Sequence, residues 1–224
     1  IWTTNDGTTI MTFHDPIQDA QIISFRGTSD VENTISDLRL GLFAPYHERP
    51  QVKVHKGMYL EYMKYRAEIV DQIVDLGLDG QTIITTGHSS GGALAMFMGI
   101  DLQSQYQEFG FTHPPAMTVY SYGKPRIGNE AFIEWVHELG ISHVRTTHAH
   151  DIIPHLPEII LGYHHTSHEI WYKDDTQYLV CNDVGDNWMN EDPACSNQCA
   201  PLTCISLPDH LKYLGYDLGI FACK

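Results

Sequence analysis

The strongest constraint on the fold is a five-residue turn, Gly87-His88-Ser89-Ser90-Gly91. A β-branched segment, QTIITT (81–86), precedes the turn, and a segment of small and apolar residues, GALAMFMGIDLQSQY (92–106), follows it. The first pattern is typical of a buried strand and the second of a helix. A G-x-S-x-G sequence between a strand and a helix predicts a turn so tight that glycine must flank it. These neighbours disfavour the alternative, an ordinary loop serine.

The rest of the chain alternates strand and helix patterns. TTIMTF (8–13) and AQIISF (20–25) predict a hairpin with its turn at Asp15-Pro16. Further strands are predicted over 52–55, 116–122, 142–148, 168–173 and 176–180, and further helices over 58–76, 130–139 and from about Asp209. We therefore expect one α/β domain over residues 1–224, with a mixed, mostly parallel sheet and helices on both faces.

Charge and composition exclude several function classes. The 224 residues are 42% hydrophobic, enough for a sizeable core. The formal charge of −15 disfavours nucleic-acid partners and adsorption to strongly anionic membranes, although fourteen histidines reduce that charge below neutral pH. No apolar run approaches the ~20 residues of a membrane helix.

A serine at such a turn becomes a nucleophile only with a histidine base and a carboxylate that orients the base. In the order typical of this turn, the carboxylate follows the serine and the histidine comes last. Asp151 directly follows a predicted strand and is the best acid. Asp101 is too close to the serine in sequence, and three others are interpreted as surface turn formers: Asp183, Asp186 and Asp192.

The base is harder to choose, because five histidines follow the candidate acid: His155, His164, His165, His168 and His210. His165 and His168 flank a strand start and are expected to form local hydrogen bonds. His210 begins a helix after the last strand, which favours it only modestly.

An oxyanion hole requires two hydrogen-bond donors aimed at the developing charge. The backbone N–H of Ser90 is one candidate, since it follows the nucleophile. Thr28, after the second strand, is the other, and an ordinary helix N-cap role is an equally good reading of that residue.

Four apolar residues between 30 and 42 share one helical face: Val31, Ile35, Leu38 and Leu42. Such a face suits a lid that opens at a lipid surface. The alternative is a helix packed permanently on the core.

All five cysteines lie near the C-terminus: Cys181, Cys195, Cys199, Cys204 and Cys223. Their clustering predicts a stapled loop and an oxidising compartment. A zinc site is disfavoured because no C-x-x-C occurs. The first four cysteines can close two local bridges, with the pairing left open.

Seven blocks in order resemble the fungal-type class 3 triacylglycerol lipase family, which includes feruloyl esterases and phospholipases A1. The blocks are FRGTSDVENTISDL (25–38), VHKGM (54–58), TGHSSGG (86–92), SYGKPRIGN (121–129), HDIIPHLP (150–157), GYHHTSHEIWY (162–172) and DHLKYLG (209–215). The resemblance implies an α/β-hydrolase fold with a short helical lid. It also implies Ser89 as nucleophile, Asp151 as acid, His210 as base, and Thr28 and Ser90 as oxyanion hole. His164 and His165 then belong to a structural block.

Three departures from the family stand out. Ser90 replaces a usual leucine, Thr34 replaces a lid tryptophan of several lipases, and a usual N-terminal segment is missing. In the family that segment often carries a cysteine paired near the C-terminus, so Cys223 is expected to bind a segment outside this sequence.

The resemblance implies a secreted, cofactor-free and metal-free ester hydrolase, a triacylglycerol lipase in transient contact with a membrane or lipid droplet. Phospholipase A1 or feruloyl esterase activity is the alternative. A silent hydrolase fold used for binding is remote, and a metalloenzyme using the histidine-rich stretch is weaker still, because no H-E-x-x-H occurs.

Overall fold

The computed structural model describes residues 2–3, 9–27, 41–166, 168–183, 191–199 and 203–218. Its centre is an eight-stranded sheet in the order β1-β2-β3-β6-β7-β8-β9-β10. The strands of this sheet are β1 (Trp2–Thr3), β2 (Thr9–Asp15), β3 (Ala20–Phe25), β6 (Thr82–His88), β7 (Met117–Tyr122), β8 (Ser142–His148), β9 (Glu169–Tyr172) and β10 (Tyr178–Val180).

The sheet is mixed, as the sequence predicts. β2 and β3 form the antiparallel hairpin, and the five strands from β3 to β9 along the sheet run parallel. β1 and β10 pair antiparallel at the two edges. Because the central strands are parallel, their carboxyl ends meet at one edge of the sheet, where loops gather.

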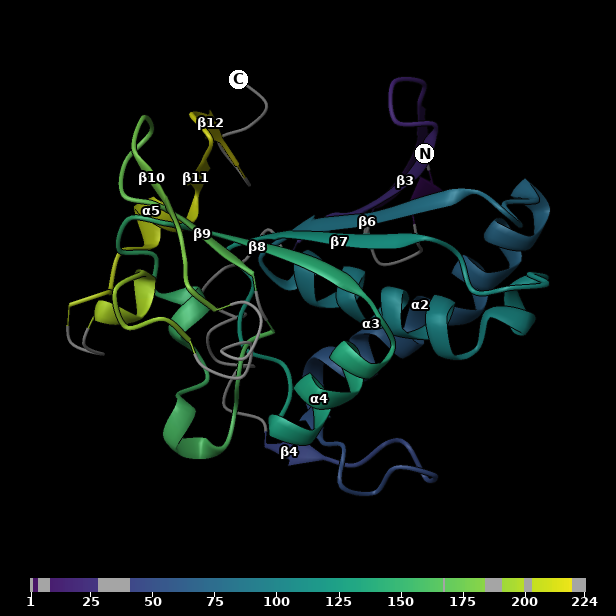
Figure 1. The fold of residues 1–224 in the computed structure, drawn as a ribbon, viewed down its shortest axis with the longest axis horizontal. Coiled ribbons are helices and arrows are strands. Elements are labelled where there is room, and N and C mark those ends of the chain that lie inside the picture. Colours follow the sequence, from purple (N-terminus) through teal and green to yellow (C-terminus); the bar gives the residue numbers. More distant parts are fainter. Residues whose placement is uncertain are drawn as a thin grey trace.

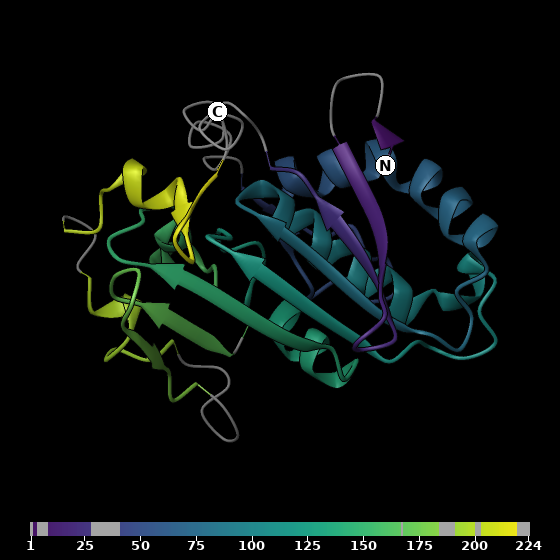
Figure 2. The same ribbon diagram turned by 90° about the horizontal axis from the view of Figure 1, so that it is seen from above.

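Three helices lie beside the sheet, α2 (Lys56–Leu76), α3 (Ser90–Ser104) and α4 (Glu130–Glu138), and α3 packs directly against β3, β6 and β7. Figures 1 and 2 show all three on the same side. Of the helices expected on both faces, the described part of the chain therefore shows those of one face. None of the described helices combines the length and apolarity needed to cross a membrane.

α3 lies between the sheet and α2, and nearly every residue of its first three turns is buried. Its one acidic residue, Asp101, accepts hydrogen bonds from the Tyr62 hydroxyl at 2.7 Å and from Arg66 Nε at 2.5 Å, both on α2. This carboxylate therefore joins two helices, which agrees with its exclusion from the acid role.

Short elements complete the chain. A small antiparallel pair joins β4 (Leu42–Phe43) to β5 (Val54–His55), and near the C-terminus α5 (Leu207–His210) precedes β11 (Lys212–Tyr213) and β12 (Tyr216–Asp217). Two 3₁₀ turns, η2 (Ile153–His155) and η3 (Ile159–Leu161), follow β8.

Two boundaries differ from the sequence prediction. Leu42 pairs with His55 in a strand, so the helical face predicted over 31–42 does not extend to Leu42. α5 begins two residues before Asp209, because the Ser206 hydroxyl accepts the Asp209 N–H and Pro208 suits the first turn of a helix.

Candidate active site

Ser89 stands at the sharp turn between β6 and α3. Its backbone has φ 58° and ψ −130°, a conformation that costs a non-glycine residue free energy. The turn brings α3 so close to the end of β3 that a Cβ on Gly91 would lie 2.3 Å from the Phe25 carbonyl oxygen. Glycine is therefore required there, and the predicted tight turn is present.

Asp151 and His210 meet beside this turn. The loop after β8 carries Asp151, and His210 ends α5; the His210 Nδ1 and Asp151 Oδ2 lie 2.9 Å apart, and both side chains are fully buried. The Tyr213 hydroxyl also donates to Asp151 Oδ2 at 2.5 Å, and the Ile153 N–H donates to Oδ1 at 2.8 Å. Burial and the Asp151 carboxylate raise the pKa of Tyr213 well above its usual range, so the phenol remains a donor.

Gly123 makes room for this group. It follows β7, between β6 with its serine and β8 with its aspartate, and has φ 58°. A Cβ on Gly123 would lie 2.8 Å from the Tyr213 hydroxyl, 2.9 Å from Asp151 Oδ2 and 3.0 Å from His210 Nδ1. A larger residue would push the carboxylate and imidazole apart.

Two buried polar atoms at the site have no hydrogen-bond partner among the described residues: Ser89 Oγ and His210 Nε2. Because Nδ1 of His210 donates to a carboxylate, the Nε2 of the neutral ring holds a lone pair. The site thus presents an unengaged hydroxyl and an unengaged imidazole acceptor, which are the donor and acceptor needed for proton transfer.

α5 is only four residues long, so surrounding groups must hold it in place. Its N-terminal side joins the Asp151 loop, because the Ser206 N–H donates to the His150 carbonyl at 3.0 Å. At its other end two imidazoles contact successive carbonyl oxygens: His148 Nδ1 lies 3.0 Å from that of Asp209, and His88 Nε2 lies 2.7 Å from that of His210.

His88 is the site residue that sequence reasoning missed. Its ring lies 4.5 Å from the His210 ring at 34°, and 5.4 Å from the Tyr213 ring. Burial and the neighbouring His210 lower the pKa of His88 to about 4, so the ring is neutral at pH 7. The position before the serine in G-x-S-x-G accepts many residues, so the motif gave no signal for His88.

The histidines that were weighed against His210 as the base form hydrogen bonds elsewhere in the structure. The backbone N–H of His164 donates to the Gly128 carbonyl, and His165 Nε2 lies 2.7 Å from the Pro154 carbonyl oxygen. His168 Nδ1 lies 3.3 Å from the carbonyl oxygen of His143, 25 residues earlier in the chain, so the local hydrogen bond expected for His168 is instead a contact to β8. Several predicted residues lie outside the described part of the chain: Thr28, Val31, Thr34, Ile35, Leu38, Asp186 and Cys223.

The interpretation of Asp183 as a surface turn residue is wrong. Asp183 is buried; its carboxylate accepts the Glu169 N–H at 3.1 Å and pairs with Arg145 at 3.4 Å. Arg145 also pairs with buried Glu169 at 3.2 Å. Sequence proximity to cysteines suggested an exposed loop, whereas the distant Arg145 on β8 draws this carboxylate inward.

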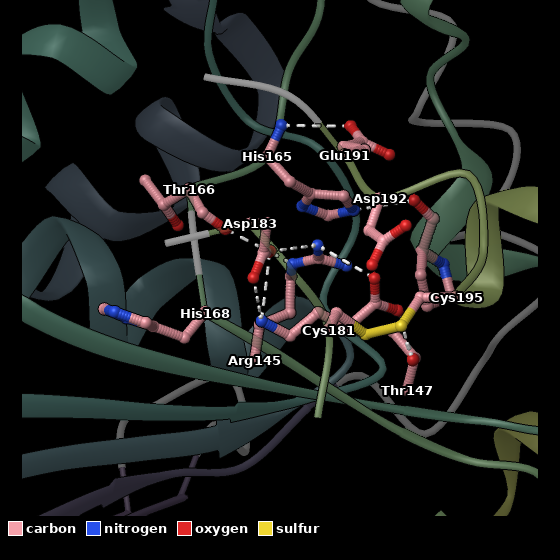
Figure 3. A network of polar contacts seen from close by, with 12 residues as sticks. Arg145, Thr147, His165, Thr166, His168, Cys181, Asp183, Glu191, Asp192 and Cys195 are labelled. Atoms are coloured by element: carbon pink, nitrogen blue, oxygen red, sulfur yellow. Dashed lines mark hydrogen bonds and ion pairs between the residues drawn. A yellow bond between two sulfur atoms is a disulfide. The ribbon is translucent and has the colours of Figure 1, made fainter. Parts of the chain in front are cut away.

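A second buried ion pair supports the loop that carries Asp151. Arg126 forms a bidentate pair with Glu191, at 2.7 and 2.6 Å. The same guanidinium donates to the carbonyl oxygens of His155 at 2.6 Å and Pro157 at 3.0 Å. Glu191 also accepts the His165 N–H at 3.2 Å (Figure 3).

Two disulfides lie in this region, Cys181–Cys195 and Cys199–Cys204, which confirms two local bridges. Among the described residues, two groups of potential metal ligands have their ligand atoms within 4.8 Å of one another. They are His155 with Cys199 and Cys204, and Glu169 with Cys181 and Cys195. In both groups the sulfur atoms are already bonded to each other, so neither offers a thiolate.

By sequence, the chain is similar to known lipases. The family model described as "Lipase (class 3)" matches residues 22–160. A lipase of Rhizomucor miehei is 34% identical over 202 residues, covering 88% of this chain and 53% of the relative.

Solved structures give the same result. The Rhizomucor miehei lipase propeptide complex has a TM-score of 0.80 at 32% identity, covering 98% of this chain and 68% of that one. A structure described as "A serine protease triad forms the catalytic centre of a triacylglycerol lipase" has a TM-score of 0.79 at 31% identity, covering 97% and 80%. The chain spans about half the length of the curated relatives it matches.

Proposed function

Since the chain belongs to the class 3 lipase family, we propose that it is a secreted serine hydrolase that cleaves the acyl esters of triacylglycerols. The observation that carries the proposal is the buried Asp151–His210 hydrogen bond beside the strained serine turn, with Ser89 Oγ and His210 Nε2 both unengaged. The two disulfides support secretion, because disulfides persist in oxidising compartments.

In the first half-reaction, Ser89 Oγ attacks the ester carbonyl carbon while His210 Nε2 takes its proton. The Asp151 carboxylate holds the imidazole tautomer and stabilises the imidazolium that forms. The carbon–oxygen bond to the glyceride then breaks, and His210 returns the proton to the departing alkoxide. The products are an acyl-serine ester and a free alcohol.

In the second half-reaction, water attacks the acyl-serine, with His210 again taking and returning a proton. The fatty acid leaves and Ser89 is regenerated. The proposed donors to the oxyanion are the backbone N–H of Ser90, at the positive end of the α3 dipole, and Thr28.

An exposed apolar turn supports a substrate presented at a lipid–water interface. η3 follows the Asp151 loop, and its three residues are exposed by 38%, 90% and 60% at Ile159, Ile160 and Leu161. The next residue, Gly162, approaches Leu42: its Cβ position would lie 3.8 Å from Leu42 Cδ1. The turn therefore lies near Leu42, which follows the proposed lid residues Val31, Ile35 and Leu38 in the sequence.

A segment bonded to Cys223 remains a prediction for this chain. A related lipase has been solved as a propeptide complex, which supports a comparable second segment here. Intact mass with and without reductant tests it. A peptide released only on reduction is expected, and a free Cys223 thiol in native protein would contradict it.

The catalytic proposal is tested with Ser89→Ala. We expect hydrolysis to fall by at least about a thousandfold, with unchanged circular dichroism, because the covalent step is lost. Wild-type protein should be labelled by a fluorophosphonate probe and the variant should not. Side-by-side assays on triacylglycerol, phospholipid and feruloyl ester distinguish the lipase from the phospholipase A1 and feruloyl esterase alternatives. Turnover by folded Ser89→Ala would overturn the proposed nucleophile.

A further inference from the structure

We propose that His88, the residue before the nucleophile, positions His210 through two contacts, a hydrogen bond to its carbonyl oxygen and a tilted ring-to-ring contact. The inference rests on the proposed role of His210 as base. His88 is a positioning residue that acts only through His210.

The first contact fixes the backbone of His210. A carbonyl oxygen can only accept, so the 2.7 Å contact requires a hydrogen on His88 Nε2. α5 ends at His210, and the last carbonyls of a helix have no partner within the helix. His88 supplies that partner as the last residue of β6, directly before the nucleophile. One strand thereby sets the positions of both Ser89 and the base.

The second contact fixes the ring of His210. The two imidazoles are 4.5 Å apart at 34°, and Asp151 contacts the His210 ring at Nδ1. The carboxylate alone leaves the ring able to tilt about that hydrogen bond, whereas a second ring against its face opposes tilting. Because His88 is neutral at pH 7, it presents an aromatic face to the His210 imidazolium during catalysis.

Neighbouring groups do not replace these contacts. His148 donates to the adjacent carbonyl, that of Asp209, and its ring lies beside Tyr213 at 5.7 Å. Tyr213 in turn donates to Asp151. His148 and Tyr213 therefore bind the neighbours of His210, namely Asp209 and Asp151. His88 contacts both the carbonyl oxygen and the ring of His210 itself.

Three substitutions separate the two contacts. His88→Gln keeps an N–H donor at similar reach but removes the ring, His88→Phe keeps the ring but removes the donor, and His88→Leu removes both. His14→Gln and His14→Leu, at a strand histidine of β2 bonded to Gln21, are the controls. All are assayed on a dissolved short-chain ester, so that lipid binding does not enter.

We expect His88→Leu to lower kcat by about tenfold to a hundredfold with KM changed less than about twofold, the loss typical of a misplaced catalytic group. His88→Gln and His88→Phe should each lose less than His88→Leu. If His88→Leu does not fold, the other two carry the test, each with an expected loss of about threefold or more. The His14 variants should match the wild type.

The deciding readout is independent of turnover. The proton on His210 Nδ1, bonded to Asp151, gives a low-field NMR resonance, which should broaden or shift in His88→Leu and less in the other two. Loss of kcat together with a changed resonance supports the inference. Native kcat, or reduced stability with an unchanged resonance, overturns it. An inactive wild type that resists fluorophosphonate would instead refute the proposed function.

Discussion

Lys124 is the residue whose burial is least expected from its chemistry. Its side chain is buried, and its ammonium donates to the Pro125 carbonyl at 3.1 Å. Burial, helped by Arg145 and Arg126, lowers the pKa of Lys124 to about 7. The charged form is therefore disfavoured in the folded protein relative to the unfolded chain.

This shift predicts a pH dependence of stability. In the unfolded chain the lysine pKa is about 10.4, so between pH 7 and roughly 10.4 the unfolded state binds more protons. The free energy of unfolding should rise with pH across that window, by about 5 kcal/mol at most from this residue. Below pH 7 both states are protonated and the full cost applies.

Lys124→Met should remove this rise. We expect urea unfolding at pH 6, 8 and 10 to show the variant more stable than the wild type at pH 6, with the difference shrinking toward pH 10. Lys53→Met, at an exposed lysine, should follow the wild-type curve. Parallel wild-type and Lys124→Met curves would contradict a displaced lysine pKa.

The success of sequence reasoning at single residues depended on local signals. The turn at Ser89 was readable because glycine is sterically required beside it, and Asp151 because it follows a strand. His88 and Asp183 were not readable, since their partners lie 122 and 38 residues away, at His210 and Arg145. Nothing local distinguishes a carboxylate bound to a distant arginine from one facing solvent.

At the scale of elements, the Asp151 loop depends on the Arg126–Glu191 pair. Their side chains are only 2% and 7% exposed. Removing one partner of a buried pair typically costs about 3–5 kcal/mol, because the other charge stays buried without compensation. Surface pairs are worth about 1 kcal/mol or less.

Glu191→Ala should therefore lower the free energy of unfolding by about 3 kcal/mol or more. Its matched control is Glu138→Ala, which breaks the 3.0 Å pair with Arg49 whose side chains are 41% and 60% exposed. Chemical denaturation should show at most about 1 kcal/mol for the control. Similar losses of unfolding free energy in both variants would show that the buried pair stabilises the fold no more than the surface pair does.

The elements themselves were largely predictable, and their boundaries less so. Alternating strand and helix patterns gave the mixed sheet, because side-chain periodicity reports burial directly. The interruption at Leu42 was missed, since four apolar residues at helical spacing fit a helix equally well whether or not a strand follows. The pairing of Leu42 with His55 is a tertiary contact that periodicity does not encode.

At the scale of the whole molecule, the side of the sheet at the carboxyl ends of the parallel strands and the side at their amino ends are expected to differ in contact with lipid. η3, with Ile160 90% exposed, follows the loop at the carboxyl edge. Ile17, 93% exposed, lies in the β2–β3 turn, before the amino end of β3 and hence at the opposite edge. The two isoleucines match in exposure and differ in position.

Ile160→Ser should reduce hydrolysis of emulsified triacylglycerol by about tenfold, because an exposed isoleucine that enters a lipid surface contributes apolar burial. Hydrolysis of a dissolved short-chain ester should not change, and Ile17→Ser should leave both activities unchanged. If the two variants lose emulsion activity equally, η3 does not face the lipid.

The disulfide at Cys181–Cys195 has a consequence for where this protein can be produced. Asp183 lies between the two cysteines and, together with Glu169, pairs with buried Arg145, so the bridge closes the loop that brings this carboxylate to the buried arginine. In a reducing cytosol the closure entropy of this loop, worth about 3 kcal/mol in the chain-entropy model, would have to come from elsewhere. We expect soluble yield to fall sharply in a reducing host, to recover in an oxidising one, and to fall more for Cys181→Ser/Cys195→Ser than for Cys199→Ser/Cys204→Ser. The choice of expression compartment then tests whether folding needs the Cys181–Cys195 bridge to hold Asp183 against Arg145.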